Sequence, residues 1–411
     1  MKKILIVSYF SSDESKVMAQ WVMDKLYAFE KLNEEIILVS STVNSKIRSF
    51  KNLKHFRVPS IYPSQYISEL KANLKSNFFV HLLFLPIVFL VGLPTELVER
   101  KILGRLGDGY WSWFFSSGLF LLLLIPFLKI KLIVTTGGPA SSHLSANVIG
   151  SIYRKKIITE LQDPLYGTDI GHNSKSKAYL LKIENFIIKK STKVVFVTKS
   201  AMLECQNRYP LAKNISFVYS SSRDFEIDCN TYYIDVATDR TLNFLHLGTI
   251  YSNRNFDNLI TAIQDLKESN LINRRIKITN IGHVSKENKR LLNSDVIEFE
   301  SLDKVNRLNG LEIINEFDLL LLIQHKDDRS KLTIPYKTWD YLNSSNLVFG
   351  LTNNRELDNI LDCHGHKFAN NSDIESIKVN LMDIIKNLKT YKTKVIKNKY
   401  ILTEQVRSLI D

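Results

Sequence analysis

Two basic side chains stand just beyond apolar, strand-like runs in the C-terminal half of the chain. Arg254 follows NFLHLGT, where Gly248 gives a ligand room to approach the backbone and Thr249 lies beside it, and Lys337 follows DLLLLIQ. Ligands of parallel sheets bind beyond the carboxyl ends of the strands, and a guanidinium fork matches phosphate oxygens. The loop that holds Arg254 therefore predicts a phosphate site, although basic residues before helices are also common.

Lys337 opens a second candidate site together with Asp340 in the segment IPYKTWDYL. Pro335 fits the first turn of a helix. Residues three apart share a helix face, so Lys337 and Asp340 should point the same way. A cation and a carboxylate so placed suit an anion and a polyol. A surface ion pair would use the same spacing, and this alternative stays open.

Two loops of the N-terminal half also follow strand-like runs. After KLIV, the loop TTGGPASSHL contains Gly137 and Gly138, which let the backbone come close to a ligand, and then Ser142 and His143. A helix start in this loop would offer free N–H groups that attract anions. After KIITEL, Asp163 precedes a proline that cannot continue the strand, and its carboxylate suits orienting a sugar hydroxyl or handling a proton. A tight turn for the glycines and a turn cap for Asp163 are the structural alternatives.

The elements that must position these loops alternate between apolar strand-like runs and helical stretches. The further runs are ILIVSY, EIILVSS, KVVFVTK, IKITNIG, VIEFES and LVFGLT, with helices such as KVMAQWVMDKLYAFEKL and FDNLITAIQDLKES between them. Runs that are apolar on both faces and joined by helices indicate parallel sheets covered on both sides. The sequence thus predicts an α/β fold with two Rossmann-like domains that face a central cleft.

Length and composition agree with two globular domains. A chain of 411 residues exceeds what one core usually organises, and the polar stretch from Ser220 to Arg240 is typical of a linker. We therefore expect domains at 1–222 and 223–411. The net charge of +13 favours an anionic partner, but no nucleic-acid recognition motif is present, so we expect no nucleic acid. The three cysteines lack the spacing of a metal site or a disulfide framework, which fits a reducing cytosol.

A basic segment followed by an apolar one suggests a membrane-facing surface. Seven basic residues and one acid, Glu69, lie between residues 46 and 75, and the apolar segment Phe78 to Leu93 follows at once. Basic groups near anionic headgroups and adjoining apolar side chains form an interfacial anchor. We expect a cytoplasmic protein that is peripheral on the inner membrane. The alternatives are a core helix and a true span, for which Trp111 to Leu128 is a second candidate. The basic residues are Lys46, Arg48, Lys51, Lys54, Arg57, Lys71 and Lys75.

The four loops TTGGPASSHL, ELQDP, LGTIYSNRN and IPYKTWDYLNSSN together resemble a known family. In order and spacing they are similar to loops of the retaining nucleotide-sugar glycosyltransferases of family four, which have the GT-B fold and build bacterial surface polysaccharides. The resemblance covers nearly the whole chain. It implies transfer of a hexose from a nucleotide-diphosphate sugar to a lipid-linked or saccharide acceptor, in capsule, exopolysaccharide or O-antigen synthesis.

The resemblance also implies roles for individual residues. Arg254 and Lys337 would contact the nucleotide diphosphate, which Gly248 would allow to approach closely. Asp340 would accept hydrogen bonds from the ribose. Asp163 would act in catalysis together with the two cations. Transfer would retain the anomeric configuration, with the donor phosphate taking up the acceptor proton. No cofactor and no metal are implied, because the two cations supply the charge of a divalent ion.

The chain departs from the family pattern at several positions. Asp340 replaces a glutamate, Leu332 stands where a second glutamate is usual, and DPL replaces DPW after Asp163. Two other classes therefore stay open. A sugar-nucleotide epimerase of the same fold would share the phosphate groups but need more acid/base side chains near the sugar. A nonenzymatic partner in polysaccharide assembly would need no acid/base side chains at this site.

Overall fold

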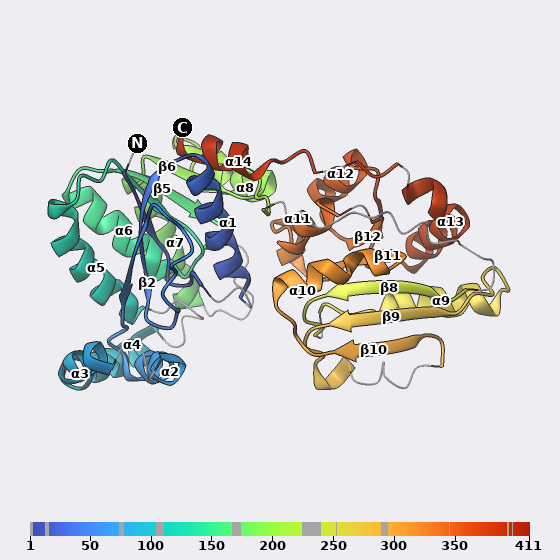
Figure 1. Ribbon diagram of the computed structural model, residues 1–411, viewed down its shortest axis with the longest axis horizontal. Helices are drawn as coiled ribbons and strands as arrows, with labels where there is room; N and C mark the ends of the chain where they lie inside the picture. Colours follow the sequence, from blue (N-terminus) through green and yellow to red (C-terminus); the bar gives the residue numbers. More distant parts are fainter. Residues whose placement is uncertain are drawn as a thin grey trace. The chain divides into compact units, whose positions relative to one another are not determined.

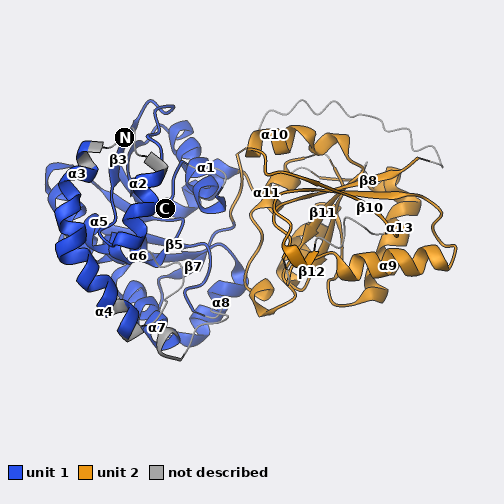
Figure 2. Cartoon of the chain, turned by 90° about the horizontal axis from the view of Figure 1, so that it is seen from below, with its two compact units in different colours: residues 1–219, 402–411 blue, residues 220–401 orange. Residues whose placement is uncertain are grey.

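The computed structural model of the protein describes residues 3–12, 16–73, 78–103, 111–166, 174–223, 240–251, 253–288, 295–344, 346–392, 394–396 and 398–411. Lys75 and most of the expected linker lie outside the described residues. The chain divides into two compact units, residues 1–219 with 402–411 and residues 220–401 (Figure 2). Each unit is built on one parallel sheet (Figure 1), which confirms the predicted α/β class.

Unit 1 contains a seven-stranded sheet in the order β3-β2-β1-β4-β5-β6-β7, with all neighbours parallel. Ile4 and Ile6 of β1 pack with helices α1 and α14 on one face, whereas Leu5 and Val7 pack with α5 and α6 on the other. The strands are apolar on both faces because both faces are covered. They are β1 (Lys3–Val7), β2 (Glu35–Ser41), β3 (Leu53–Val58), β4 (Leu132–Thr135), β5 (Lys156–Leu161), β6 (Lys193–Phe196) and β7 (Ile215–Phe217).

The last helix of the chain returns to unit 1. Leu402, Val406 and Leu409 of α14 join the core cluster that includes α1. The expected domain bounds, 1–222 and 223–411, placed this helix in the second domain. The sequence of a nine-residue helix does not show which hydrophobic core the helix packs against. The helices of unit 1 are α1 (Val17–Lys31), α2 (Pro63–Asn73), α3 (Phe78–Ile87), α4 (Leu93–Leu103), α5 (Ser112–Leu124), α6 (Ala140–Ile152), α7 (Ser174–Lys190), α8 (Lys199–Arg208) and α14 (Leu402–Ile410), with η1 (Val88–Gly92) and η2 (Ile125–Phe127).

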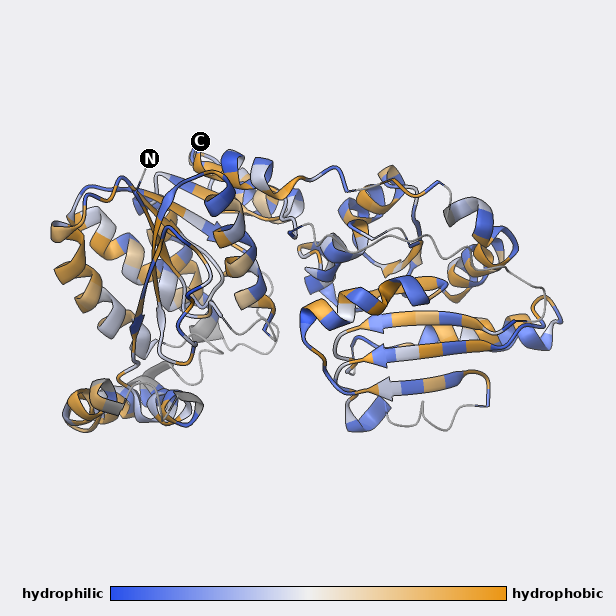
Figure 3. Cartoon of the chain, in the orientation of Figure 1, coloured by the Kyte–Doolittle hydropathy of each residue, from blue (hydrophilic) through white to orange (hydrophobic). Residues whose placement is uncertain are grey.

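One helical stretch of unit 1 is apolar and yet exposed. The helix α3, the π-helical η1 and α4 follow one another from Phe78 to Leu103, and Figure 3 shows how apolar the stretch is. Within it, residues 81–98 have a mean hydropathy of 1.9, and 22% of them are buried. Phe79, Leu83 and Leu90 are 79%, 75% and 77% exposed. The alternative of a core helix is therefore wrong. Among the described residues, this is the one helix long and apolar enough to cross a membrane.

A buried carboxylate ties α2 to the segments that follow three strands. Glu69 of α2 is fully buried. It accepts hydrogen bonds from the hydroxyls of Tyr9 (2.8 Å), Ser41 (2.7 Å) and Thr42 (2.6 Å). The N–H and the hydroxyl of Ser60 also donate to it, at 2.9 and 2.6 Å. Helix α2, which precedes the apolar stretch in the chain, is thereby connected to the carboxyl edge of the sheet.

Unit 2 contains a six-stranded parallel sheet in the order β10-β9-β8-β11-β12-β13. The order of the strands reverses between β8 and β11, and ligands of open α/β sheets bind beyond the strands at such a switch point. The strands are β8 (Leu242–Leu247), β9 (Ile276–Ile281), β10 (Glu298–Leu302), β11 (Leu319–Ile323), β12 (Val348–Thr352) and β13 (Lys367–Asn370). The helices are α9 (Asp257–Glu268), α10 (Arg307–Glu312), α11 (Lys337–Leu342), α12 (Arg355–Cys363) and α13 (Ile374–Lys392), with η4 (Ile313–Glu316) and η5 (Asp328–Lys331).

Candidate functional site

The ammonium group of Lys337 reaches from the start of α11 to the end of β8. Its Nζ donates to Nε2 of His246 (2.6 Å) and to the carbonyl oxygen of Leu247 (2.9 Å). A Cβ added at Gly248 would lie 3.7 Å from this Nζ, and the φ of Gly248, 134°, is one that favours glycine. Thr249 beside it is exposed. The structure thus brings Lys337 and Gly248 together at the switch point.

Arg254 lies at the same strand ends and is partly buried, like Lys337. Its Nε donates to the carbonyl oxygen of Ile323, the last residue of β11 (2.7 Å). Burial, and then the charge of Arg254, hold the pKa of Lys337 well below its usual value. Burial also lowers the pKa of Arg254 itself. Burial and mutual repulsion make the charged forms of the two side chains less stable, and a bound anion would stabilise both charges.

The imidazole of His246 is part of this site, and the sequence argument missed it. His246 is fully buried inside β8. Burial, and then the charges of Lys337 and Arg254, hold its pKa well below the usual value, so the ring is neutral. The signal in the sequence is a histidine inside a mostly apolar strand, two positions before Gly248.

Asp340 lies on α11 and is bonded to an arginine from a distant segment. Arg307 donates to both of its carboxylate oxygens, from Nη2 at 2.6 Å and from Nε at 3.2 Å. Both side chains are buried, and the guanidinium of Arg307 also lies over the ring of Tyr336. The expected partner of Asp340 was either a ribose or Lys337 as a surface ion pair. The structure shows a buried, bidentate pair with Arg307, which sequence spacing could not reveal.

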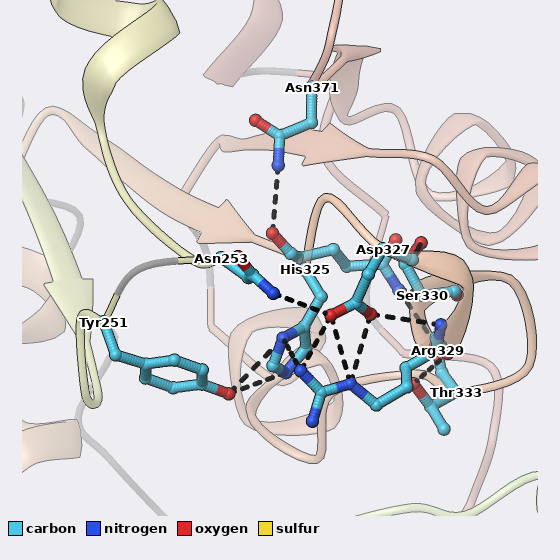
Figure 4. Close-up of polar contacts among 9 residues, drawn as sticks. Tyr251, Asn253, His325, Asp327, Arg329, Ser330, Thr333 and Asn371 are labelled. Atoms are coloured by element: carbon cyan, nitrogen blue, oxygen red, sulfur yellow. Dashed lines mark hydrogen bonds and ion pairs between the residues drawn. The ribbon is translucent and has the colours of Figure 1, made fainter. Parts of the chain in front are cut away.

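A polar cluster next to Arg254 joins the loop after β8 to the loop after β11 (Figure 4). The hydroxyl of Tyr251 lies 2.7 Å from Nε2 of His325, and Asn253 and Arg329 donate to Oδ2 of Asp327 at 3.2 and 2.8 Å. Burial, and then the charges of Arg254 and Arg329, lower the pKa of His325 to about 4, so its ring is neutral at pH 7. These contacts hold together the loop that carries Arg254 and the loop that leads to Lys337.

In unit 1 the loop after β4 is closely packed. A Cβ at Gly137, whose φ is 74°, would lie 2.9 Å from Oγ of Ser8 and 3.1 Å from Cγ2 of Val22. The positive φ and this packing together favour a glycine, as a tight turn would, and a role of Gly137 in ligand binding stays a prediction. Gly138, with a φ of 37°, faces more open space, since the nearest atom to its Cβ would be Sδ of Met18 at 3.9 Å.

Ser142 and His143 point into the structure of unit 1. Oγ of Ser142 accepts the N–H of Tyr9 (3.1 Å), which joins α6 to the segment after β1. His143 is buried, and its Nδ1 is hydrogen-bonded to the hydroxyl of Thr135. Burial lowers the pKa of His143 to about 4. Both side chains thus have partners within unit 1, and their expected contact with a substrate stays a prediction.

Asp163 follows β5, and its side chain is exposed. Three residues earlier, Glu160 forms a buried ion pair with Lys25 of α1 (2.9 Å), and the hydroxyl of Thr136 also donates to it. Sequence reasoning missed this pair, because Lys25 lies in the middle of a helix far from Glu160 in the chain. Among the described residues, no group of three or more His, Cys, Asp or Glu side chains is placed to hold a metal ion.

Comparisons with known proteins identify the architecture. No known protein family and no curated protein sequence matches the chain. Solved structures do match over 100% of its length. The lipopolysaccharide outer core galactosyltransferase WaaB has 11% identity and a TM-score of 0.60 over 99% of its chain. A glycosyltransferase from Rickettsia africae has 13% identity and 0.62 over 97%. Anabaena HepE, solved with UDP and glucose, has 10% identity and 0.59 over 98%. The chain therefore has the GT-B fold of these glycosyltransferases.

Proposed function

We propose that this protein is a glycosyltransferase that takes a sugar from a nucleotide-diphosphate donor bound at Arg254 and Lys337. The observation that carries the proposal is the placement of these two cations. Both lie at the switch point of the unit 2 sheet, next to a glycine whose backbone a ligand can approach closely. The structures of the GT-B fold, including one solved with UDP and glucose, support a nucleotide sugar as the ligand.

The chemistry follows from the charges at this site. As the bond between the anomeric carbon and the donor phosphate breaks, negative charge grows on the leaving diphosphate. Arg254 and Lys337 stabilise that charge because they are fixed in place beforehand. The acceptor hydroxyl attacks the same face of the sugar, and its proton passes to an oxygen of the leaving phosphate. The configuration at the anomeric carbon is then retained, and the family that the loops resemble works in this way.

Binding of nucleotides tests the donor site directly. The thermal unfolding of the full chain is measured with UDP, GDP, ADP and their sugar derivatives. One of them should stabilise the wild-type protein, by about 2.7 kcal/mol at 100 times its dissociation constant. Lys337→Ala and Arg254→Ala should lose this effect. Lys378→Ala is the matched control, because Lys378 forms exposed ion pairs with Asp265 and Glu375 on another part of unit 2. No stabilisation by any of these nucleotides contradicts the proposal.

Product analysis then separates transfer from the other classes. We propose a lipid-linked or saccharide acceptor in the synthesis of a bacterial surface polysaccharide, so membranes from cells that contain the protein should incorporate radiolabelled sugar. A changed sugar that is still attached to the nucleotide would instead indicate an epimerase. Binding without turnover would indicate an assembly partner.

We also propose that unit 1 lies on the cytoplasmic face of the inner membrane through the helix α3–η1–α4. Its apolar side chains face outward, and α5 adds a stripe of exposed Phe115, Leu119 and Leu123 at i, i+4 and i+8. Basic side chains contribute on the order of 1 kcal/mol each near anionic headgroups. The exposed ones that precede this helix are Lys46, Arg48, Lys51, Lys54 and Lys71.

Flotation with vesicles tests this surface. The protein should float with vesicles of phosphatidylglycerol and phosphatidylethanolamine, and high salt should weaken the binding. Leu83→Glu together with Leu90→Glu should abolish it. Leu211→Glu is the control, because Leu211 is 93% exposed but does not lie on this helix. Binding that resists salt and carbonate would show a true span, and absence of binding would refute the proposal.

A further inference from the structure

A chain of hydrogen bonds runs beneath the Lys337 ammonium group from one strand to the next. Asn280 donates from Nδ2 to the carbonyl oxygen of Gly282 (3.0 Å), and its Oδ1 lies 2.7 Å from Nδ1 of His246. Nε2 of His246 lies 2.6 Å from Nζ of Lys337. An ammonium group only donates, so Nε2 is the acceptor. The ring proton is then on Nδ1, which donates to Asn280.

The sheet itself places both side chains. His246 and Asn280 stand opposite each other in the parallel register of β8 and β9, and both are fully buried. The imidazole also packs nearly perpendicular to the ring of Phe256, with centroids 5.4 Å apart. The imidazole is therefore held at both nitrogens and by its neighbouring ring, in one orientation.

We propose that His246 and Asn280 are positioning residues for the diphosphate site. They present a neutral imidazole acceptor that sets the place of the Lys337 ammonium group beside Gly248. The inference rests on the proposed function, because the ammonium group so placed is the one that contacts the diphosphate. Within the described part of the chain, Lys337 uses two of its three N–H donors, on His246 and Leu247. The third is left to meet a phosphate oxygen.

The neutral state of the ring is essential to this arrangement. A protonated imidazole would donate from both nitrogens and could not accept from Lys337. Burial opposes such protonation by lowering the pKa of the ring, and so do the charges of Lys337 and Arg254. Asn280 adds no negative charge that would favour it. A carboxylate in the place of Asn280 would stabilise the charged ring, which explains why an amide suits this position.

Two substitutions of His246 test the role. His246→Leu removes the acceptor, whereas the side-chain oxygen of His246→Gln retains one. The dissociation constant of the tightest of UDP, GDP and ADP should rise at least tenfold in His246→Leu and less than threefold in His246→Gln. Adding His246→Leu to Lys337→Ala should cost nothing further, because the residue would act through Lys337. His366→Leu, which removes another buried imidazole of unit 2, controls for lost stability.

A merely structural role would lower stability in His246→Leu but leave the dissociation constant unchanged, or add to the effect of Lys337→Ala, and either result would overturn the proposal. A second arm needs no nucleotide. Nitrogen-15 NMR of histidine-labelled, ligand-free protein should show His246, identified by its loss in His246→Gln, as the neutral tautomer with the proton on Nδ1 at pH 7. The other tautomer or an imidazolium would refute the arrangement, even if the proposed function had failed because no nucleotide binds.

Discussion

The dependence of nucleotide affinity on pH tests the surroundings of Lys337. In the free protein, burial and the charge of Arg254 hold the pKa of Lys337 well below its usual value. A diphosphate beside the ammonium group raises that pKa again. Binding therefore takes up a proton at pH values between the pKa of the free protein and the raised pKa of the complex. The affinity is greatest below the pKa of the free protein and falls as the pH rises through the pKa of the complex.

Lys337→Met removes both the titrating group and one donor to the phosphate. A hydrogen bond that involves a charged group contributes about 1.5–3 kcal/mol, which corresponds to a roughly 10- to 150-fold rise in the dissociation constant. In this variant, the part of the pH dependence of nucleotide affinity that comes from the titration of Lys337 should be lost.

Calorimetric titration in two buffers with different ionisation enthalpies measures the protons taken up per nucleotide bound. At pH values between the pKa of Lys337 in the free protein and its pKa in the complex, the wild-type protein and the control Lys378→Met should take up the same fraction of a proton, and Lys337→Met should take up less. A wild-type affinity that stays constant across this range, or equal uptake in Lys337→Met, would refute the account of the site.

Three further substitutions test other parts of the structure. Asp163→Asn should reduce turnover far more than nucleotide affinity; equal loss of affinity and turnover, or a loss of thermal stability, would argue against a role at the acceptor. Arg307→Met should lower the free energy of unfolding in urea by about 3–5 kcal/mol, because it leaves the Asp340 carboxylate buried without its partner. An unchanged midpoint of the urea transition would mean that the pair is open to water. Glu69→Gln should cost about 1–3 kcal/mol, because an amide N–H₂ replaces an acceptor among five donors; a neutral result would contradict that network.

The sequence predicted the strands that are long and apolar. β8 and β11 were found because both faces of each strand are covered, and they are the strands that flank the candidate site. The strands β3, β7 and β13 were missed. Half of the residues of β3, LKHFRV, are polar, and β3, β7 and β13 each lie at an edge of a sheet. Edge strands bury less surface, so their sequences carry a weaker apolar signal.

Within the site, the sequence could predict individual groups but not their partners. Gly248, Arg254 and Lys337 were found because each lies on a loop that follows a long strand, and the structure brings them together. The contact of His246 with Lys337 depends on which strands are neighbours. The pairing of Arg307 with Asp340 depends on where α10 lies. Neither arrangement has a local signature in the chain.

The carboxylate of Glu69 has a mechanical consequence. It accepts hydrogen bonds from groups that follow β1, β2 and β3, so α2 is fixed to the carboxyl edge of the sheet. The helix that follows is also held, because a Cβ at Gly92 would lie 1.9 Å from the carbonyl oxygen of Ile61. A bilayer that bound α3–η1–α4 would therefore set the tilt of all of unit 1. On the proposal that the protein transfers a sugar to a lipid-linked acceptor, the loops after β1 and β4 would then stand at a fixed height above the headgroups, and the distance between the lipid and the reacting hydroxyl would decide which acceptors fit.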